Sequence, residues 1–346
     1  MLAYDFGPKH PLRPIRLSRA IELAARMGFE AADPGPGDVQ DVLRVHDPDF
    51  VDYVRKRSVQ DEVEDRFRFG SLDNPAFEGM YEASLAYVAG TVAATRAVVA
   101  GAPLAISLSG GLHHARRSEA SGFCVFNDPA IAVALLLESF GRVAYVDIDV
   151  HHGDGVQWLH YDNPRVMTCS IHQDGRTLYP GTGSVEETGA ACTSINVPLP
   201  PGTTGDVWLE GFERVIMEAL RRFQPDAVVL QMGTDAHSSD PLARLQITAQ
   251  EWLSAVRRVK GLGLPTVAVG GGGYHVGTVP RLWVGACLTL EGRDVPETLP
   301  EDLGAAWGEP TFLDASLPEP RDQGRDQLDV VVHWHERITL PEISPR

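Results

Sequence analysis

Short apolar runs alternate with amphipathic stretches over most of the 346 residues. The apolar runs are typical of buried parallel strands, and they cover residues 104–108, 144–148, 166–171, 227–232 and 266–269. The amphipathic stretches have helical spacing, and they cover residues 13–27, 38–45, 48–57, 75–100, 128–139 and 206–223. A capping box formed by Thr248 and Glu251 opens one more helix. Because strands that alternate with helices build βαβ units, the pattern predicts an α/β fold with one central, mostly parallel sheet flanked by helices.

The residue composition changes near residue 310, where a stretch rich in Pro, Asp and Gly begins. We predict a main domain over residues 1–310 and a C-terminal extension over residues 311–346 that packs on, or extends, the same domain. Within the extension, residues 328–339 are predicted to form one more strand, and His333 and His335 are expected to be exposed to solvent. The charged, turn-rich residues 61–74 predict a surface loop.

Composition narrows the classes of protein. A net charge of −17 disfavours a sequence-independent grip on nucleic acid, which needs Lys and Arg at phosphates. The four cysteines form no CxxC pair, so neither a thiolate zinc site nor a disulfide framework is expected. Arg96, Gly101 and Pro103 interrupt the most apolar region. The first residues lack a basic segment followed by an apolar one. We therefore expect a soluble, cytoplasmic protein without a membrane span or a signal peptide.

Candidate chemistry begins at the end of the apolar run at 144–148. Asp147, Asp149 and His151 occupy alternating positions, which in a strand would leave the same face of the sheet. Buried carboxylates beside an imidazole are costly unless they are paired or bind a metal. The spacing therefore favours a zinc ion or a related divalent ion over ordinary hydrogen bonds.

Three other apolar runs are also followed by loops that contain candidate catalytic or metal-binding residues. The first loop holds His113 and His114, the second holds Asp235, and the third holds Tyr274 after four glycines. In an open parallel sheet, sites lie at the carboxyl ends of the strands, so these loops are expected to converge on one pocket.

The residue types in that pocket suggest a reaction. Asp149, His151 and Asp235 would hold zinc with an open position. His113 and His114 could act as base and acid, and Asp147 and Asp154 could orient them. Tyr274 could donate to a developing oxyanion. This set suits hydrolysis of an amide by a metal-bound water.

Five ordered segments resemble the zinc-dependent histone deacetylase superfamily: residues 109–115 (SGGLHHA), 121–124 (SGFC), 146–155 (VDIDVHHGDG), 231–235 (QMGTD) and 270–274 (GGGGY). The chain is most similar overall to the bacterial members called acetoin-utilisation proteins, and the resemblance extends from residue 10 to about residue 296. It implies the arginase-deacetylase fold, with residues 1–310 as the catalytic domain. It further implies hydrolysis of N-ε-acetyl-lysine in proteins to acetate and free lysine, with an acetyl-CoA synthetase as one target that the bacterial relatives suggest.

The resemblance also implies roles for the catalytic residues. Asp149, His151 and Asp235 match the zinc ligands. His114, partnered by Asp154, matches the general base and later acid. His113, partnered by Asp147, matches a mainly electrostatic histidine, and Tyr274 matches the residue that polarises the acetyl carbonyl.

Further residues match positions around the substrate and a second ion. Phe123 and Tyr179 match the walls around the lysine stem, Gly122 lines the same channel, and Asp73 matches a rim carboxylate that holds the substrate backbone. A structural potassium site is implied at Asp147, Asp149, His151, Ser170 and Ile171. Arg16 matches an arginine near an internal acetate-release pocket.

Two positions depart from the family pattern. The second wall is commonly Phe, whereas Tyr179 adds a hydroxyl. His237 matches no family role, and we expect it at a rim in contact with water, or with a peptide substrate.

Three other functions remain open. An acetylpolyamine amidohydrolase would carry an acidic gatekeeper where this chain has Leu242. A ureohydrolase with two manganese ions would need an aspartate where this chain has Leu112. A binding protein without catalysis would have lost Tyr274 or a ligand. The sequence does not distinguish Zn²⁺ from Fe²⁺, nor a monomer from a homodimer.

Overall fold

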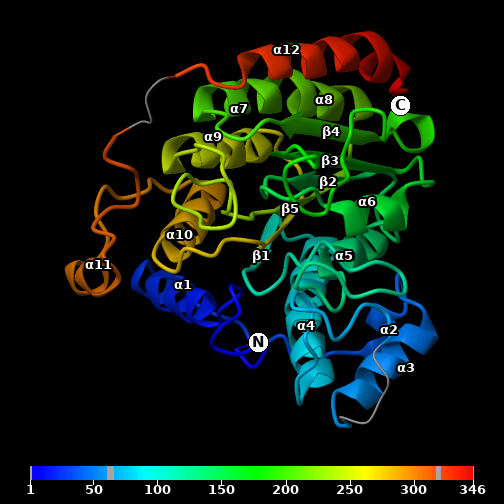
Figure 1. The fold of residues 1–346 in the computed structure, drawn as a ribbon, viewed down its shortest axis with the longest axis vertical. Helices are drawn as coiled ribbons and strands as arrows, with labels where there is room; N and C mark the ends of the chain where they lie inside the picture. The colour runs from blue at the N-terminus through cyan, green and yellow to red at the C-terminus, as the bar shows by residue number, and fades with distance from the viewer. Residues whose placement is uncertain (1, 61–65, 317–320, 346) are drawn as a thin grey trace.

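A six-stranded sheet runs through the centre of the computed structural model, which describes residues 2–60, 66–316 and 321–345 (Figure 1). Every neighbouring pair of strands is parallel, and the order across the sheet is β1-β6-β5-β2-β3-β4. The strands are β1 (Leu104–Ser107), β2 (Val143–Asp147), β3 (Val166–Gln173), β4 (Ser194–Leu199), β5 (Ala227–Gln231) and β6 (Thr266–Val269). The predicted α/β class and parallel sheet are confirmed.

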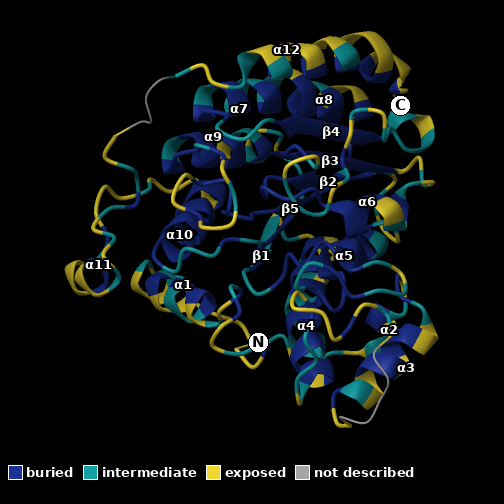
Figure 2. Cartoon of the chain, in the orientation of Figure 1, coloured by how far each residue is buried: buried dark blue, intermediate teal, exposed yellow. Residues whose placement is uncertain are grey.

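Each face of the sheet packs against its own hydrophobic core, and most strand residues are buried (Figure 2). Alternating side chains of β2 divide between the two cores, with Ala144 and Val146 in one and Val143 and Tyr145 in the other. Burial on both faces explains why the strands read as continuous apolar runs rather than as alternating ones.

Twelve α-helices of the described residues surround the sheet. They are α1 (Ile15–Arg26), α2 (Val39–Val42), α3 (Pro48–Arg57), α4 (Met80–Val99), α5 (Asp128–Leu136), α6 (Asp154–His160), α7 (Gly205–Gly211), α8 (Glu218–Phe223), α9 (Ala249–Lys260), α10 (Thr278–Glu291), α11 (Glu301–Trp307) and α12 (Arg325–Trp334). The core with Ala144 contains side chains of α1, α7, α9, α10 and α12, and the other contains side chains of α3, α4 and α5. Neither α4 nor any other helix of the described residues combines the length and apolarity of a membrane crossing.

The predicted helices lie at the positions where the structure has helices, but their predicted lengths agree less well with the observed ones. The predicted helix at 206–223 is divided into α7 and α8 by a π-helical segment, Phe212–Met217. The capping box of Thr248 and Glu251 is present at the start of α9. Strand β4 and helices α6, α10 and α11 have no counterpart among the predicted elements. Of the predicted loop at 61–74, residues 61–65 lie outside the described residues, and residues 66–74 form turns and bends.

The prediction of a strand over residues 328–339 is wrong. These residues form most of α12 and the π-helical segment His335–Thr339 that follows it. Leu328, Val331 and Val332 are buried at helical spacing in the core that contains Ala144. His335 is also buried, contrary to expectation, and its Nε2 lies 2.8 Å from the carbonyl oxygen of Asn196 in β4.

This buried histidine predicts a loss of stability in acid. Burial lowers the pKa of His335 to about 4, although the hydrogen bond to Asn196 opposes the shift. The unfolded chain then binds more protons than the folded chain between pH 6.5 and about 4, so stability is lost as the pH falls through that window. His335 contributes up to about 3 kcal/mol of this loss.

We expect His335→Leu to cost about 1–3 kcal/mol at pH 8, because the Asn196 carbonyl loses its partner. We also expect a shallower decline in stability between pH 6.5 and 4. Urea unfolding at several pH values measures both effects. His333→Leu is the matched control, since His333 is exposed. An unchanged pH slope in the His335 variant would contradict the prediction.

Candidate active site

Three buried side chains form a group that could hold a metal ion. Asp149, His151 and Asp235 each offer one ligand atom, and these atoms lie within 4.8 Å of one another. His151 Nδ1 lies 3.1 Å from Asp149 Oδ1 and 3.0 Å from Asp235 Oδ2. Burial and the neighbouring Asp149 raise the pKa of Asp235 to about 7, although His151 opposes this shift. Two carboxylates that resist being charged together, beside an imidazole nitrogen, fit the donor set of a divalent cation.

The backbone that carries these ligands is a turn and not the extended strand that was predicted. Strand β2 ends at Asp147, and Asp149 and His151 follow it. Asp147 Oδ1 accepts from the amide of Asp149 at 3.0 Å, and Asp149 Oδ1 accepts from the amide of His151 at 2.9 Å. Asp235 Oδ1 accepts from the amide of Val150 at 2.8 Å. Each of these carboxylates therefore has at least one oxygen that accepts a backbone hydrogen bond.

Glycines let neighbouring loops approach the carboxylates closely. A Cβ at Gly233 would collide with Asp149, and a Cβ at Gly272 would collide with Asp235. The amide of Gly272 donates to Asp149 Oδ2 at 2.8 Å, and Gln231 Nε2 donates to the same oxygen at 2.9 Å. The predicted convergence of the loops after β2, β5 and β6 is therefore present, and the glycines are part of its cause.

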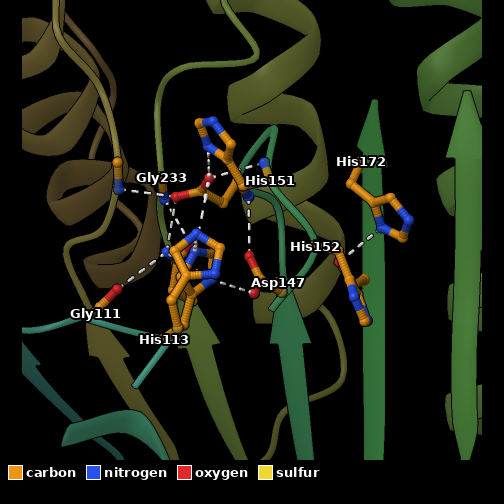
Figure 3. Close-up of polar contacts among 12 residues, drawn as sticks. Gly111, His113, Asp147, His151, His152, His172 and Gly233 are labelled. Atoms are coloured by element: carbon orange, nitrogen blue, oxygen red, sulfur yellow. Dashed lines mark hydrogen bonds and ion pairs between the residues drawn. The ribbon is translucent and has the colours of Figure 1, made fainter. Parts of the chain in front are cut away.

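The two histidines after β1 each contact a carboxylate. His113 Nδ1 lies 2.8 Å from Asp147 Oδ2, and His114 Nδ1 lies 2.7 Å from Asp154 Oδ1. The two Nε2 atoms are 3.1 Å apart. Figure 3 shows His113 beside Asp147, whereas His152 and His172 lie on the far side of Asp147.

The environments of these histidines push their pKa values apart. Burial lowers the pKa of His113, but the carboxylates of Asp147 and Asp149 outweigh burial and raise it to about 9. Burial and the charge of His113 lower the pKa of His114 to about 4, despite Asp154. With His113 charged and His114 neutral, the Nδ1 atoms of both rings donate to their carboxylates, and Nε2 of His114 carries the lone pair that can accept a proton.

Residues that the sequence analysis did not single out hold the histidine loop. Asp128, at the start of α5, accepts from the amides of Gly111 and Leu112, both at 2.9 Å. Asn127 Nδ2 donates to the carbonyl oxygen of His113 at 2.9 Å. Asp128 Oδ2 also accepts from Thr91 at 2.6 Å. The Asn-Asp pair just before a helix was the available signal, but at a helix start it predicts a cap first.

Tyr274 is held through the backbone of its own segment. Its amide donates to Asp240 Oδ2 at 2.7 Å. Arg16 is buried and donates to the carbonyl oxygens of Gly271 and Gly273, at 2.7 and 3.1 Å. Burial raises the pKa of Tyr274 well above its usual value, so the phenol keeps its proton. Tyr274 is therefore a hydrogen-bond donor at the pH at which proteins work.

The predicted channel walls lie next to the histidine pair. The ring centroid of Tyr179 is 5.0 Å from that of His114, and that of Phe123 is 5.8 Å from that of Tyr274. The hydroxyl of Tyr179 bonds to Ser121 Oγ. A Cβ at Gly122 would collide with His114, so this glycine permits the close approach of the wall.

The remaining predicted residues lie around this centre. Asp73 and Leu242 are exposed. Ser170 in β3 is the sheet partner of Asp147, and Ile171 follows it. Ser170 Oγ lies 2.9 Å from His172 Nδ1. Thus the residues expected to bind potassium lie on the adjacent strands β2 and β3 and in the segment that follows β2.

Two small cavities meet at Arg16. One, of about 20 Å³, is lined by His113, His114, Phe123 and Tyr274 among others. The second, of about 40 Å³, extends toward Tyr4 and Trp283 and shares Leu12, Arg16 and Leu112 with the first. A larger and mainly apolar hollow of about 970 Å³ lies near Leu104 and Thr266, at the amino ends of β1 and β6. The chemistry-bearing residues therefore gather at a small cavity and not at this larger hollow.

Comparisons with known proteins agree with this geometry. A model of the histone deacetylase domain matches residues 10–290. The chain is 36% identical over 339 residues to the acetoin utilization protein AcuC of Bacillus subtilis (strain 168), covering 92% of this chain and 88% of that protein. It is 38% identical over 321 residues to histone deacetylase B of Dictyostelium discoideum, covering 89% of this chain and 76% of that protein.

A solved structure gives the same result. The crystal structure of an HDAC homologue from Aquifex aeolicus superposes with a TM-score of 0.87 at 27% identity, covering 96% of this chain and 98% of that chain. Sequence and structure thus agree over nearly the whole length, and the protein belongs to the histone deacetylase family, a family of hydrolases with the arginase-deacetylase fold.

Proposed function

We propose that this protein removes acetyl groups from N-ε-acetyl-lysine side chains of proteins and releases acetate and free lysine. The carrying observation is that His113, His114, Asp149 and Tyr274 line one small cavity. His151 and Asp235 lie with Asp149 in the ligand group, and each of the two histidines contacts its own carboxylate. Family membership supports the deacetylase class. The geometry supports roles for individual residues.

The ligand group would hold Zn²⁺, or Fe²⁺, which accepts the same donors. When bound, the ion supplies Lewis acidity, which polarises a carbonyl and makes water more acidic. The carboxylates of Asp149 and Asp235 would offset its charge, so part of the carbonyl polarisation must come from the protein. A structural K⁺ beside Asp147 and Ser170 remains part of the proposal.

His114 would act as the general base. Its neutral Nε2 takes a proton from the attacking water and later gives that proton to the departing lysine nitrogen. Asp154 fixes the ring through Nδ1 at 2.7 Å. Arg116 donates to the second oxygen of Asp154 at 2.9 Å and keeps that carboxylate charged. His113, protonated beside Asp147, would stabilise negative charge that develops at the reacting carbonyl.

Tyr274 would donate its phenolic proton to the carbonyl oxygen as that oxygen gains charge. Phe123 and Tyr179 would enclose the methylene stem of the lysine, and the exposed Asp73 would hold the substrate backbone.

A protein substrate is favoured over an acetylated polyamine because Leu242 is apolar where an acidic gatekeeper would be needed. Rates with acetylspermidine and with an acetyl-lysine peptide separate the two, and an acetylated acetyl-CoA synthetase is the first protein substrate to test. The protein would act in the cytoplasm.

Removal of the Tyr274 hydroxyl tests the mechanism. We expect Tyr274→Phe to lower kcat on an acetyl-lysine peptide by about 10²-fold or more, as loss of an oxyanion donor does. Steady-state kinetics with defined metal content measure the effect. Tyr161→Phe, outside the cavity lining, is the matched control. A rate near that of the unaltered protein would remove Tyr274 from the mechanism.

Metal removal tests the ligand group independently of activity. Chelation should lower the free energy of unfolding, and Zn²⁺ at 100 times its Kd should restore about 2.7 kcal/mol. Asp235→Asn should abolish the response to Zn²⁺. Asp302→Asn, at an exposed ion pair with Arg26, should keep it. Thermal unfolding with and without Zn²⁺ measures this stabilisation. If Zn²⁺ stabilised the Asp235 variant as much as the unaltered protein, the assignment of Asp235 as a metal ligand would be contradicted.

A further inference from the structure

His237 lies two residues after the proposed ligand Asp235, and the structure corrects the expectation that it lies at a rim in water. Its side chain is only 4% exposed. His237 Nε2 lies 2.9 Å from Asp314 Oδ2. The amide of Ser239 donates to His237 Nδ1 at 3.1 Å, which places the ring proton on Nε2. His237 therefore donates to Asp314.

Asp314 belongs to residues 309–314, here called the C-terminal strap, which lies beyond the 10–290 range matched by the family model. Figure 1 shows the chain running beside α10 after it leaves α11. Asp314 Oδ2 also accepts from the amide of Ala249 at 2.7 Å, at the start of α9. Its Oδ1 accepts from Arg281 of α10 at 2.7 Å. The carboxylate thus joins two helices to the loop of His237.

The strap is fixed to α10 at more than one point. Arg281 is 3% exposed, donates to the carbonyl oxygen of Phe312 at 2.8 Å and pairs with Glu309 at 3.1 Å. The side chain of Phe312 is fully buried. An anchored arginine and a buried phenyl ring give Asp314 a fixed position.

The loop that His237 anchors carries two parts of the candidate site. Asp235 lies at its start. The carbonyl oxygen of His237 accepts from the amide of Asp240 at 2.9 Å, and Asp240 Oδ2 in turn accepts from the amide of Tyr274. A displacement of His237 would therefore shift both Asp235, the proposed metal ligand, and Tyr274, the proposed oxyanion donor.

We propose that Asp314 and His237 are positioning residues, and that the C-terminal strap holds the 235–240 loop so that Asp235 and Tyr274 keep their places. This inference rests on the proposed function. It assigns a role in the site to a segment outside the matched domain and to a histidine without a family role.

The test compares four single variants of the full-length protein, Asp314→Asn, His237→Leu, His237→Gln and Asp329→Asn, and the double variant of Asp314→Asn with His237→Leu. Asp329 is exposed on α12 and is the matched Asp→Asn control. The readouts are kcat and KM on an acetyl-lysine peptide, Zn²⁺ affinity by competition with a chromophoric chelator, and thermal unfolding.

We expect Asp314→Asn and His237→Leu each to lower kcat or Zn²⁺ affinity by about 10–100-fold, as loss of outer-shell partners does. KM should stay within about twofold, because Phe123 and Tyr179 lie outside the loop, and such a split separates displacement of the reacting groups from loss of uniform binding. The double variant should be little worse than either single one. His237→Gln should recover most of the loss, because its amide can donate to Asp314.

Several results would overturn the proposal: a kcat and a Zn²⁺ affinity like those of the unaltered protein in folded Asp314→Asn, additive losses in the double variant, or no difference between His237→Gln and His237→Leu. If Asp314→Asn does not fold, the two His237 variants decide. If the unaltered protein binds Zn²⁺ but leaves acetyl-lysine intact, the proposed function fails, and the Zn²⁺ affinities alone decide whether the strap positions Asp235.

Discussion

The site depends on keeping two carboxylates, Asp149 and Asp235, buried within reach of one another. Like charges in a poorly solvated interior repel strongly, and each oxygen needs a donor or a cation. Backbone amides of Val150, His151 and Gly272 provide part of the compensation. The imidazole of His151 adds to it, and the divalent ion proposed for this site would complete it. The loops after three strands must therefore bring their main chains into contact with the carboxylates, which is why glycine occupies positions 233 and 272.

The same short segment also sets the difference between the two histidines. Asp147 orients His113, and Asp149, which faces the ligand group, adds to the charge near His113. Burial and the charge of His113 lower the pKa of His114 and outweigh the effect of its partner Asp154. Two adjacent histidines thus acquire opposite protonation states from unequal access to carboxylates. The assignment of one as base and the other as electrostatic partner follows from this inequality.

The grouping of Asp149, His151 and Asp235 with the two histidines could be predicted from the sequence because these residues follow apolar strands, and the carboxyl ends of parallel strands lie at the same end of a sheet. The sequence did not predict their supports. Asn127, Asp128, Gln231 and Asp240 lie at helix starts, strand ends and turns, where polar residues have many roles and no periodicity marks them. The segment at 328–339 was mistaken because Leu328, Val330 and Val332 also fit a period of two. Val330 is in fact exposed, and burial follows the helical positions instead.

Helix α12 has a consequence for how copies of this protein behave toward each other. Strand β4 is the last strand of the sheet on its side, and an open edge strand is a template for pairing with another chain. The buried side chains of α12 pack into the same core as those of β4, and Nε2 of His335 forms a hydrogen bond with the carbonyl oxygen of Asn196. The segment at 325–339 thus covers part of this edge, and we expect a protein shortened before residue 325 to leave the carbonyl oxygen of Asn196 free to pair with another chain.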